Sequence, residues 1–295
     1  MRWWILGGVA LVALVLAAII NAPAWVAWFY RVRQDSAVSS LPTAPPFQAS
    51  DRALVVSPHP DDESLACGGP IQQALAAGAQ VWIVWLTAGD GFEWDAVVTN
   101  RTLRPVGTPM RELALRRQQE ARRAAEILGV PASHEVFLGY PDGGLLHMFF
   151  DYYDQPYTSR YTGLRAVALP GALNPGATYT GANLQADLQS VLTSVDPTVV
   201  LAPSPMDRHP DHRAAGDVVL RILGQRGQVD LVRWWIVHGG VEWPLPKGLH
   251  VNLPLVPPPR GAAPPWQQVP PTRDQEAVKE QAIRAHRSQT EVESR

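Results

Sequence analysis

Short apolar runs and amphipathic runs alternate along most of this chain. Runs of strand-forming residues occur at positions 53–56, 80–87, 135–138, 198–202 and 231–237. Segments with helical spacing of apolar residues lie at positions 63–77, 110–128, 184–195, 211–223 and 272–291. Strands that alternate with helices of this length indicate right-handed βαβ crossovers. The pattern therefore predicts an α/β fold built on a mostly parallel sheet.

The chain begins with an apolar run, residues 3–20, that carries no charged side chain. This run is long enough to cross a bilayer, and aromatic residues lie at both ends of segment 1–30, as in a spanning helix. The alternative is a cleaved signal peptide that ends at Ala22-Pro23-Ala24, but the run exceeds the usual apolar core of about 7–15 residues. We therefore expect residues 1–30 to be a single-pass membrane anchor, with an orientation that the flanking arginines leave open.

The composition of the remaining chain indicates a linker followed by a globular region. Residues 31–50 are polar and contain prolines, which is typical of a linker, and residues 51–295 have enough apolar content for the core of one large domain or two small ones. The proline-rich segment 244–271 cannot be regular helix. A net charge of -2 gives no reason to expect a nucleic-acid partner. The single cysteine, Cys67, excludes an intrachain disulfide and a cysteine-based metal cluster.

Two histidine motifs follow predicted strands. The first is His59-Pro60-Asp61-Asp62-Glu63 and the second is His209-Pro210-Asp211-His212. Proline favours the first helical position, so each histidine is expected at a helix N-cap. In open parallel sheets, ligands bind beyond the carboxyl ends of the strands. One such motif is often only a helix start, but two together predict a mononuclear metal site with an open position for water.

These motifs, with three shorter ones, carry a family resemblance. The shorter ones are Cys67-Gly68-Gly69, Leu86-Thr87-Ala88-Gly89-Asp90 and Leu138-Gly139-Tyr140-Pro141-Asp142-Gly143. Together they resemble the PIG-L/LmbE family of zinc-dependent N-acetylglucosaminyl deacetylases. The resemblance runs from about Asp51 to the segment 285–289. It implies that residues 51–295 form one deacetylase domain, built on a Rossmann-like sheet with helices on both faces.

The resemblance also implies roles for the motif residues. His59, Asp62 and His212 would be the metal ligands, and Asp61 the general base that activates a zinc-bound water. His209 would stabilise the oxyanion and protonate the departing amine. Ligand chemistry agrees, since one carboxylate of the pair can bind the metal while its neighbour works on the water. One Zn²⁺ per chain is expected, although Fe²⁺ or Co²⁺ suit the same ligands.

Three further residues are predicted to bind the substrate. Arg117 lies on the apolar face of its helix and resembles a family arginine that faces the sugar, although a buried ion pair would also explain it. Asp142 follows a strand and matches a sugar-hydroxyl ligand, although a turn would also place aspartate there. His286 reaches the site from the C-terminal helix or is a core histidine. Asp211 is either a partner that orients an imidazole or a helix cap.

The sequence thus predicts a metal-dependent hydrolase that removes the acetyl group from a substrate containing N-acetylglucosamine. The alternatives are an amidase for a non-sugar amide and a catalytically silent, tethered sugar-binding protein. Because a tether favours membrane- or envelope-bound substrates, the catalytic domain is expected outside the cytoplasm. The alternative is an anchor that only localises an enzyme of soluble metabolism, with Arg31 and Arg33 holding the domain inside. An aromatic insertion at residues 144–180 is either a lid or sugar-stacking wall, or a packing elaboration. No motif accompanies His134, His147, His238 and His250, which are interpreted as structural.

Overall fold

The computed structural model describes residues 25, 29, 32–91, 106–240, 243–245, 253–259 and 265–293. The chain divides into two compact units. One unit comprises residues 1–44 and 239–268, in which the Gln34 amide donates to the Leu245 carbonyl oxygen at 2.6 Å. The other comprises residues 45–238 and 269–295 and contains the sheet and every predicted site residue.

A five-stranded parallel sheet forms the centre of the larger unit. Its strands are β1 (Arg52–Ser57), β2 (Gln80–Thr87), β3 (Glu135–Tyr140), β4 (Val199–Pro203) and β5 (Val232–Trp235). They lie in the order β3-β2-β1-β4-β5. The central strands are apolar and almost completely buried, as expected where helices cover both faces of a parallel sheet. The prediction of a mostly parallel α/β sheet is confirmed.

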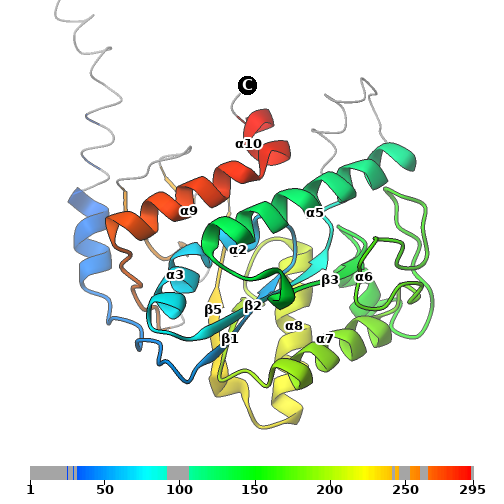
Figure 1. The fold of residues 1–295 in the computed structure, drawn as a ribbon, viewed down its shortest axis with the longest axis horizontal. Helices are drawn as coiled ribbons and strands as arrows, with labels where there is room; N and C mark the ends of the chain where they lie inside the picture. Colours follow the sequence, from blue (N-terminus) through cyan, green and yellow to red (C-terminus); the bar gives the residue numbers. More distant parts are fainter. Residues whose placement is uncertain are drawn as a thin grey trace, which may run out of the picture. The chain divides into compact units, whose positions relative to one another are not determined.

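Helices pack on both faces of this sheet (Figure 1). One side carries α3 (Gly68–Ala76), α5 (Thr108–Leu128) and α9 (Arg273–Ala285), and the other carries α7 (Gly181–Val195) and α8 (Pro210–Gln225). This division follows from the strand order. From β1 the chain first adds β2 and β3 on one side and later β4 and β5 on the other. Because the crossovers are right-handed, the two directions place their helices on opposite faces of the sheet. The strands β1 and β4 are therefore the neighbours between which the strand order reverses. Ligands of such sheets usually bind at the carboxyl ends of these two strands.

Two predicted helices are each divided in the structure. The expected helix at 63–77 is α2 (Asp62–Leu65) followed by α3, because Pro70 has no N–H with which to continue one helix past Ala66. The expected C-terminal helix is α9 followed by α10 (Arg287–Glu293), with His286 at the break. The N-cap prediction is correct for His209, whose ring accepts from the Asp211 N–H, but wrong for His59, since Asp61 precedes α2.

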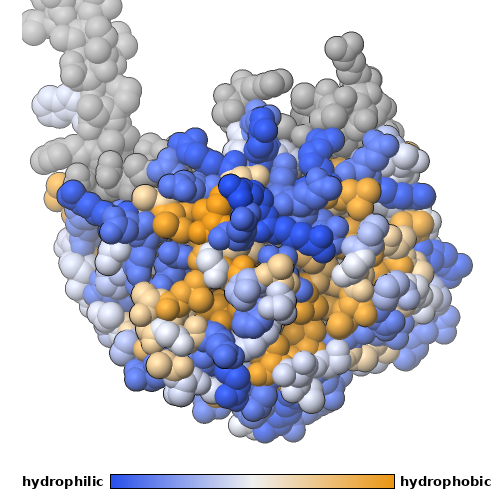
Figure 2. Space-filling view, viewed as in Figure 1, coloured by the Kyte–Doolittle hydropathy of each residue, from blue (hydrophilic) through white to orange (hydrophobic). Residues whose placement is uncertain are grey.

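The aromatic insertion 144–180 contributes to both the core and the surface. It contains the short helix α6 (Leu145–Phe150), and Phe149 and Tyr179 are buried in the main core. By contrast, Phe150 and Tyr152 are 60% and 39% exposed. Figure 2 shows apolar residues across the middle of the face in view, surrounded by hydrophilic ones. Much of the insertion therefore serves packing, while some of its aromatic side chains reach solvent.

The predicted membrane location is corrected by the structure. Among the residues that the structure describes, no helix is both long enough and apolar enough to cross a bilayer. The apolar run at residues 3–20, on which the anchor prediction depended, lies outside the described residues. The single-pass anchor and the extracytoplasmic placement are therefore withdrawn.

Candidate metal centre and active site

The predicted metal ligands converge beyond the carboxyl ends of β1 and β4. His59 Nδ1 lies 3.3 Å from Asp62 Oδ2, His212 Nε2 lies 3.1 Å from the same oxygen, and the two nitrogens are 3.3 Å apart. Ligands about 2.0–2.2 Å from a tetrahedral zinc ion lie roughly 3.3–3.6 Å from one another. The three atoms therefore fit one divalent ion after adjustments of a few tenths of an ångström. All three side chains are buried.

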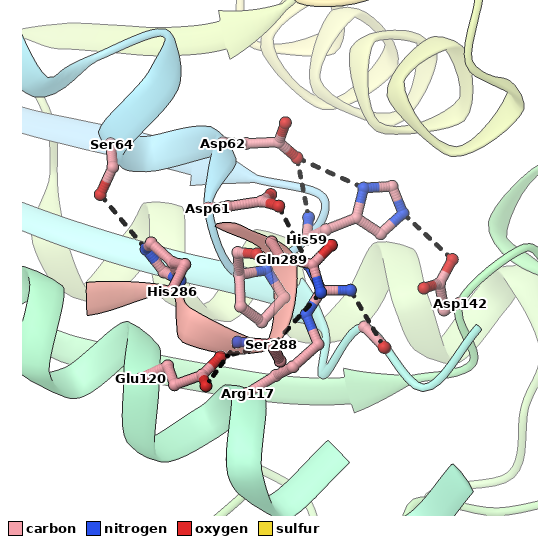
Figure 3. Close-up of polar contacts among 12 residues, drawn as sticks. His59, Asp61, Asp62, Ser64, Arg117, Glu120, Asp142, His286, Ser288 and Gln289 are labelled. Atoms are coloured by element: carbon pink, nitrogen blue, oxygen red, sulfur yellow. Dashed lines mark hydrogen bonds and ion pairs between the residues drawn. The ribbon is translucent and has the colours of Figure 1, made fainter. Parts of the chain in front are cut away.

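The second nitrogen of His59 contacts two further carboxylates. His59 Nε2 lies 3.1 Å from Asp211 Oδ2 and 3.3 Å from Asp142 Oδ1 (Figure 3 shows Asp142). Asp211 also accepts the N–H groups of Gly143 at 2.6 Å and Leu145 at 3.0 Å. Burial alone would lower the pKa of His59, but Asp142, Asp211 and Asp62 outweigh burial and raise it well above its usual value. A carboxylate on the far nitrogen orients a metal-binding imidazole, so Asp211 suits that role.

Asp207 does the same for His212. Its Oδ2 lies 3.2 Å from His212 Nδ1 and accepts the N–H groups of Val237 and His238 at 2.9 and 3.1 Å. Burial lowers the pKa of His212, but Asp62 and Asp207 outweigh it and raise the pKa to about 9. Because Nδ1 faces Asp207, Nε2 is the nitrogen available to a metal.

Other combinations of side chains near the site could also hold an ion. His59, His209 and His212 form one such group, and Asp62, His212 and His238 form another. Asp62 fits better as the third ligand than His209, since its oxygen lies within 3.3 Å of both other ligand atoms. His238 lies beside His212, with ring centroids 4.7 Å apart.

Asp61 is held beside this centre in an uncommon backbone conformation. Its φ of 122° lies in a region that residues other than glycine rarely adopt. Its N–H donates to Glu63 Oε2 at 3.0 Å, and its Oδ2 accepts from Arg117 Nη2 at 3.2 Å. Burial raises the pKa of Asp61 to about 6, against the opposing effect of Arg117. A carboxylate with this pKa is suited to accept a proton near neutral pH.

Arg117 belongs to α5 and is only 3% exposed. Its guanidinium also donates to the carbonyl oxygens of Pro60 at 2.5 Å and Gly89 at 3.0 Å. The Nε atom has no hydrogen-bond partner among the described residues. The buried ion pair considered from the sequence is therefore present, and its partner is Asp61.

His209 lies at the half-buried edge of the site, with its ring centroid 4.8 Å from that of His59. Its Nδ1 accepts the Asp211 N–H at 3.2 Å. Because a backbone N–H can only donate, the neutral ring must carry its proton on Nε2. Burial and the nearby His59 lower the pKa of His209 to about 4, so the neutral form predominates at neutral pH.

His286 approaches from the C-terminal helices and is 1% exposed. Its Nε2 lies 2.8 Å from Glu63 Oε1 and 3.3 Å from Ser64 Oγ. Two residues later, Ser288 donates from its N–H and Oγ to Glu120 at 2.9 and 2.6 Å (Figure 3). Glu120 of α5 therefore binds the C-terminal segment.

The structure brings six of the predicted residues into one cluster: His59, Asp61, Asp62, Asp142, His209 and His212. Arg117 joins the cluster through Asp61, and His286 joins it through Glu63. No role was predicted for Asp207 or Glu63, and His238 was interpreted as structural. The position of His238 just after β5 was the available signal, because it too follows the carboxyl end of a strand.

Fold and site together define an α/β protein with a candidate hydrolytic metal centre at the carboxyl ends of β1 and β4, where the strand order of the parallel sheet reverses. The chain belongs to the PIG-L family, described as GlcNAc-PI de-N-acetylase, whose profile matches residues 54–223. The matched region contains all six residues of the cluster and Arg117, whereas His286 and Ser288 lie beyond it.

Individual relatives are similar over part of the chain. Diacetylchitobiose deacetylase of Thermococcus kodakarensis is 29% identical over 197 residues, covering 66% of this chain and 57% of that protein. A 1D-myo-inositol 2-acetamido-2-deoxy-alpha-D-glucopyranoside deacetylase of Actinosynnema mirum is 33% identical over 192 residues, covering 64% and 58%. The chain thus spans a little over half the length of these relatives. The solved structure of N,N'-diacetylchitobiose deacetylase from Pyrococcus horikoshii is 22% identical, with a TM-score of 0.44 over 81% of this chain and 71% of that one.

Proposed function

We propose that this protein is a metal-dependent hydrolase that removes the acetyl group from a substrate containing N-acetylglucosamine. The observation that carries the proposal is the set of three ligand atoms from His59, Asp62 and His212, all 3.1–3.3 Å apart, with Asp61 beside them. Family membership supports the reaction class, and both curated relatives bear the names of sugar deacetylases.

Asp61 is proposed as the general base. Its carboxylate neighbours the ligand Asp62 in sequence, and its raised pKa of about 6 suits proton transfer near neutral pH. Arg117 holds Asp61 Oδ2 at 3.2 Å and so limits the directions in which the carboxylate can turn. The proton that Asp61 takes from water is then available for the departing amine nitrogen. This replaces the expected proton transfer from His209, which is neutral because its pKa is lowered to about 4.

His59, Asp62 and His212 would hold the ion, for which zinc is proposed. When bound, a divalent ion supplies Lewis acidity, which polarises the amide carbonyl and makes water a better nucleophile. The Nε2–H of neutral His209 is proposed to donate to the carbonyl oxygen as negative charge develops there. Such a hydrogen bond from His209 requires no positive charge on its ring, in agreement with its lowered pKa of about 4.

Asp142 remains the proposed contact for a sugar hydroxyl. Its side chain is 11% exposed, whereas that of Asp211, which also contacts His59, is 0% exposed. Asp142 Oδ2 accepts the N–H of Gly91 at 3.0 Å, which orients the carboxylate. Direct substrate contacts from Arg117 and His286 stay predictions from the sequence, and both side chains have carboxylate partners in the structure.

The proposal is tested with purified, metal-loaded protein and a panel of N-acetylated sugars and non-sugar amides. Acetate release from N-acetylglucosamine compounds, dependent on bound metal, is the expected result. Release only from non-sugar amides would indicate the amidase instead. Sugar binding without acetate release from any compound would indicate the silent binding protein.

A further inference from the structure

The junction between α9 and α10, residues 286–288, contacts both elements that hold Asp61. His286 reaches α2 through Glu63, with 2.8 Å between Nε2 and Oε1. Ser288 reaches α5 through Glu120, which lies one helical turn beyond Arg117. Figure 3 shows these groups converging from separate elements on the region around Asp61. A segment outside the matched family region therefore reaches the proposed active site.

Glu63 links this junction to the backbone of Asp61. Its carboxylate is completely buried and accepts Trp85 Nε1 at 2.9 Å and Ser64 Oγ at 2.8 Å, in addition to the contact with His286. The same Oε2 that accepts from Trp85 also accepts the Asp61 N–H at 3.0 Å. A buried carboxylate with this many donors has little freedom to turn. Its orientation therefore determines where the Asp61 N–H can lie.

The backbone of Asp61 needs such support. A φ of 122° is strained for aspartate and persists only where the surrounding structure enforces it. Glu63 holds the Asp61 N–H, while Arg117 holds both the preceding carbonyl oxygen of Pro60 and the Asp61 carboxylate. Loss of either support would let Asp61 relax towards an ordinary conformation and turn its carboxylate away from the metal ligands.

We propose that His286 and Glu63 are positioning residues that maintain the strained backbone of Asp61, and that the α9–α10 junction is thereby part of the catalytic apparatus. The role of Asp61 as base is taken from the proposed function. The simpler alternative is that the Glu63–His286 pair only attaches α9 to the rest of the unit. Such an attachment would affect stability but not the rate of the chemical step in the folded enzyme.

The test replaces His286 in the full-length, metal-loaded protein. His286→Leu fills a similar volume without a donor, whereas His286→Gln retains an amide that can reach Glu63. We expect His286→Leu to lower kcat by about 10²-fold, the typical effect of misplacing a catalytic group by about 1 Å. Because a positioning role requires no direct contact between His286 and the substrate, KM and metal content should stay near the wild-type values. His286→Gln should recover most of kcat. If folded His286→Leu kept kcat within about threefold of wild type, the proposal would be overturned.

His134→Leu is the matched control. His134 Nδ1 lies 2.9 Å from the Val81 carbonyl oxygen and its ring stacks on Trp82, just before β3 and away from the site. This variant should keep wild-type kcat. If His286→Leu does not fold, His286→Asn replaces it, because its shorter amide also cannot span the distance to Glu63.

A crystal structure of the His286 variant separates this proposal from the proposed function. If wild-type protein released no acetate, the deacetylase proposal would fail. The backbone conformation of Asp61 in the variant would still test the positioning role. We expect Asp61 to leave its φ of 122° and to lose its contact with Arg117 in the variant. An unchanged Asp61 backbone would overturn the positioning role.

Discussion

Neighbouring carboxylates acquire opposite protonation properties in this site. Burial raises the pKa of Asp61 to about 6, against the opposing effects of Arg117 and His286. Burial also acts on Asp62, but His212 and His59 outweigh it and hold the pKa of Asp62 well below its usual value. Asp62 therefore stays ionised as a ligand requires, while Asp61 can exchange a proton near neutral pH. The difference arises from their partners, because the two residues have the same chemistry.

Replacement of Asp61 by asparagine should separate catalysis from metal binding. The amide cannot accept a proton, so Asp61→Asn is expected to lose about 10²–10⁴-fold in kcat. Metal content should remain near that of the wild type, because Asp62 keeps its contacts with His59 and His212. Steady-state acetate release and metal analysis measure the two quantities. A loss of less than tenfold would exclude Asp61 as the base.

Replacement of His212 by alanine should remove the metal. His212 supplies one of the three proposed ligand atoms and is completely buried, so its removal leaves only His59 and Asp62 of the proposed set. His212→Ala is expected to bind zinc at least 10²-fold more weakly than wild type in a titration with a competing chelator. His209→Ala serves as the comparison and should keep its zinc. Full metal retention in His212→Ala would show the ligand assignment to be wrong.

At the level of elements, the loop after β2 determines where Arg117 can lie. Gly89 has a φ of 68°, and its carbonyl oxygen accepts Arg117 Nη1 at 3.0 Å. A β-carbon at Gly89 would lie 2.2 Å from the same nitrogen. The close approach of helix and loop therefore requires glycine for steric reasons as well as for its backbone conformation.

Gly89→Ala is expected to displace Arg117 and to lower kcat at least tenfold, because Arg117 no longer holds Asp61. Gly227→Ala is the matched control, since Gly227 has a similar φ of 66° but no atom within 4 Å of an added β-carbon. Both variants should lose about 1–2 kcal/mol of stability from the positive φ. Thermal unfolding and kcat measure the two effects. Equal activities of the two variants would contradict the assigned contact.

For the whole molecule, the site concentrates negative charge in a chain whose net charge is only -2. Its buried carboxylates come from the ends of several strands: Asp62, Asp90, Asp207 and Asp211 are each no more than 6% exposed. Two of them differ in protonation. Burial acts on Asp207, but His212 outweighs it and lowers the pKa, whereas burial raises the pKa of Asp90 to about 7. A bound cation would relieve this concentration of charge in the folded state.

Removal of the metal should therefore destabilise the fold. A ligand that binds only the folded state adds about 2.7 kcal/mol when its concentration is 100 times Kd. We expect chelator-treated protein to unfold at a lower temperature and zinc to restore the wild-type midpoint. The His212→Ala variant should show little change with zinc. An equal response of both proteins to zinc would place the ion elsewhere.

The sequence by itself determined the alternating elements and the candidate residues of the site. Strand periodicity, the two histidine–proline motifs and their positions after β1 and β4 are local features. Because parallel strands end at one edge of a sheet, this local information was enough to bring the predicted ligands together. The spacing of apolar residues did not predict that Pro70 divides the helix after β1. The apolar N-terminal run led to a predicted membrane location that the structure does not support.

Only the tertiary structure decided which partner each functional group has. Glu63 and His286 are 223 residues apart in sequence, and Arg117 and Asp61 are 56 apart. Periodicity can show that a charged residue faces inward, but it contains no information on which buried carboxylate that residue meets. The contacts of Asp207 with His212 and of Asp211 with His59 were likewise visible only in the structure. Such pairings depend on how loops from different strands pack against one another, and that packing follows from the whole fold.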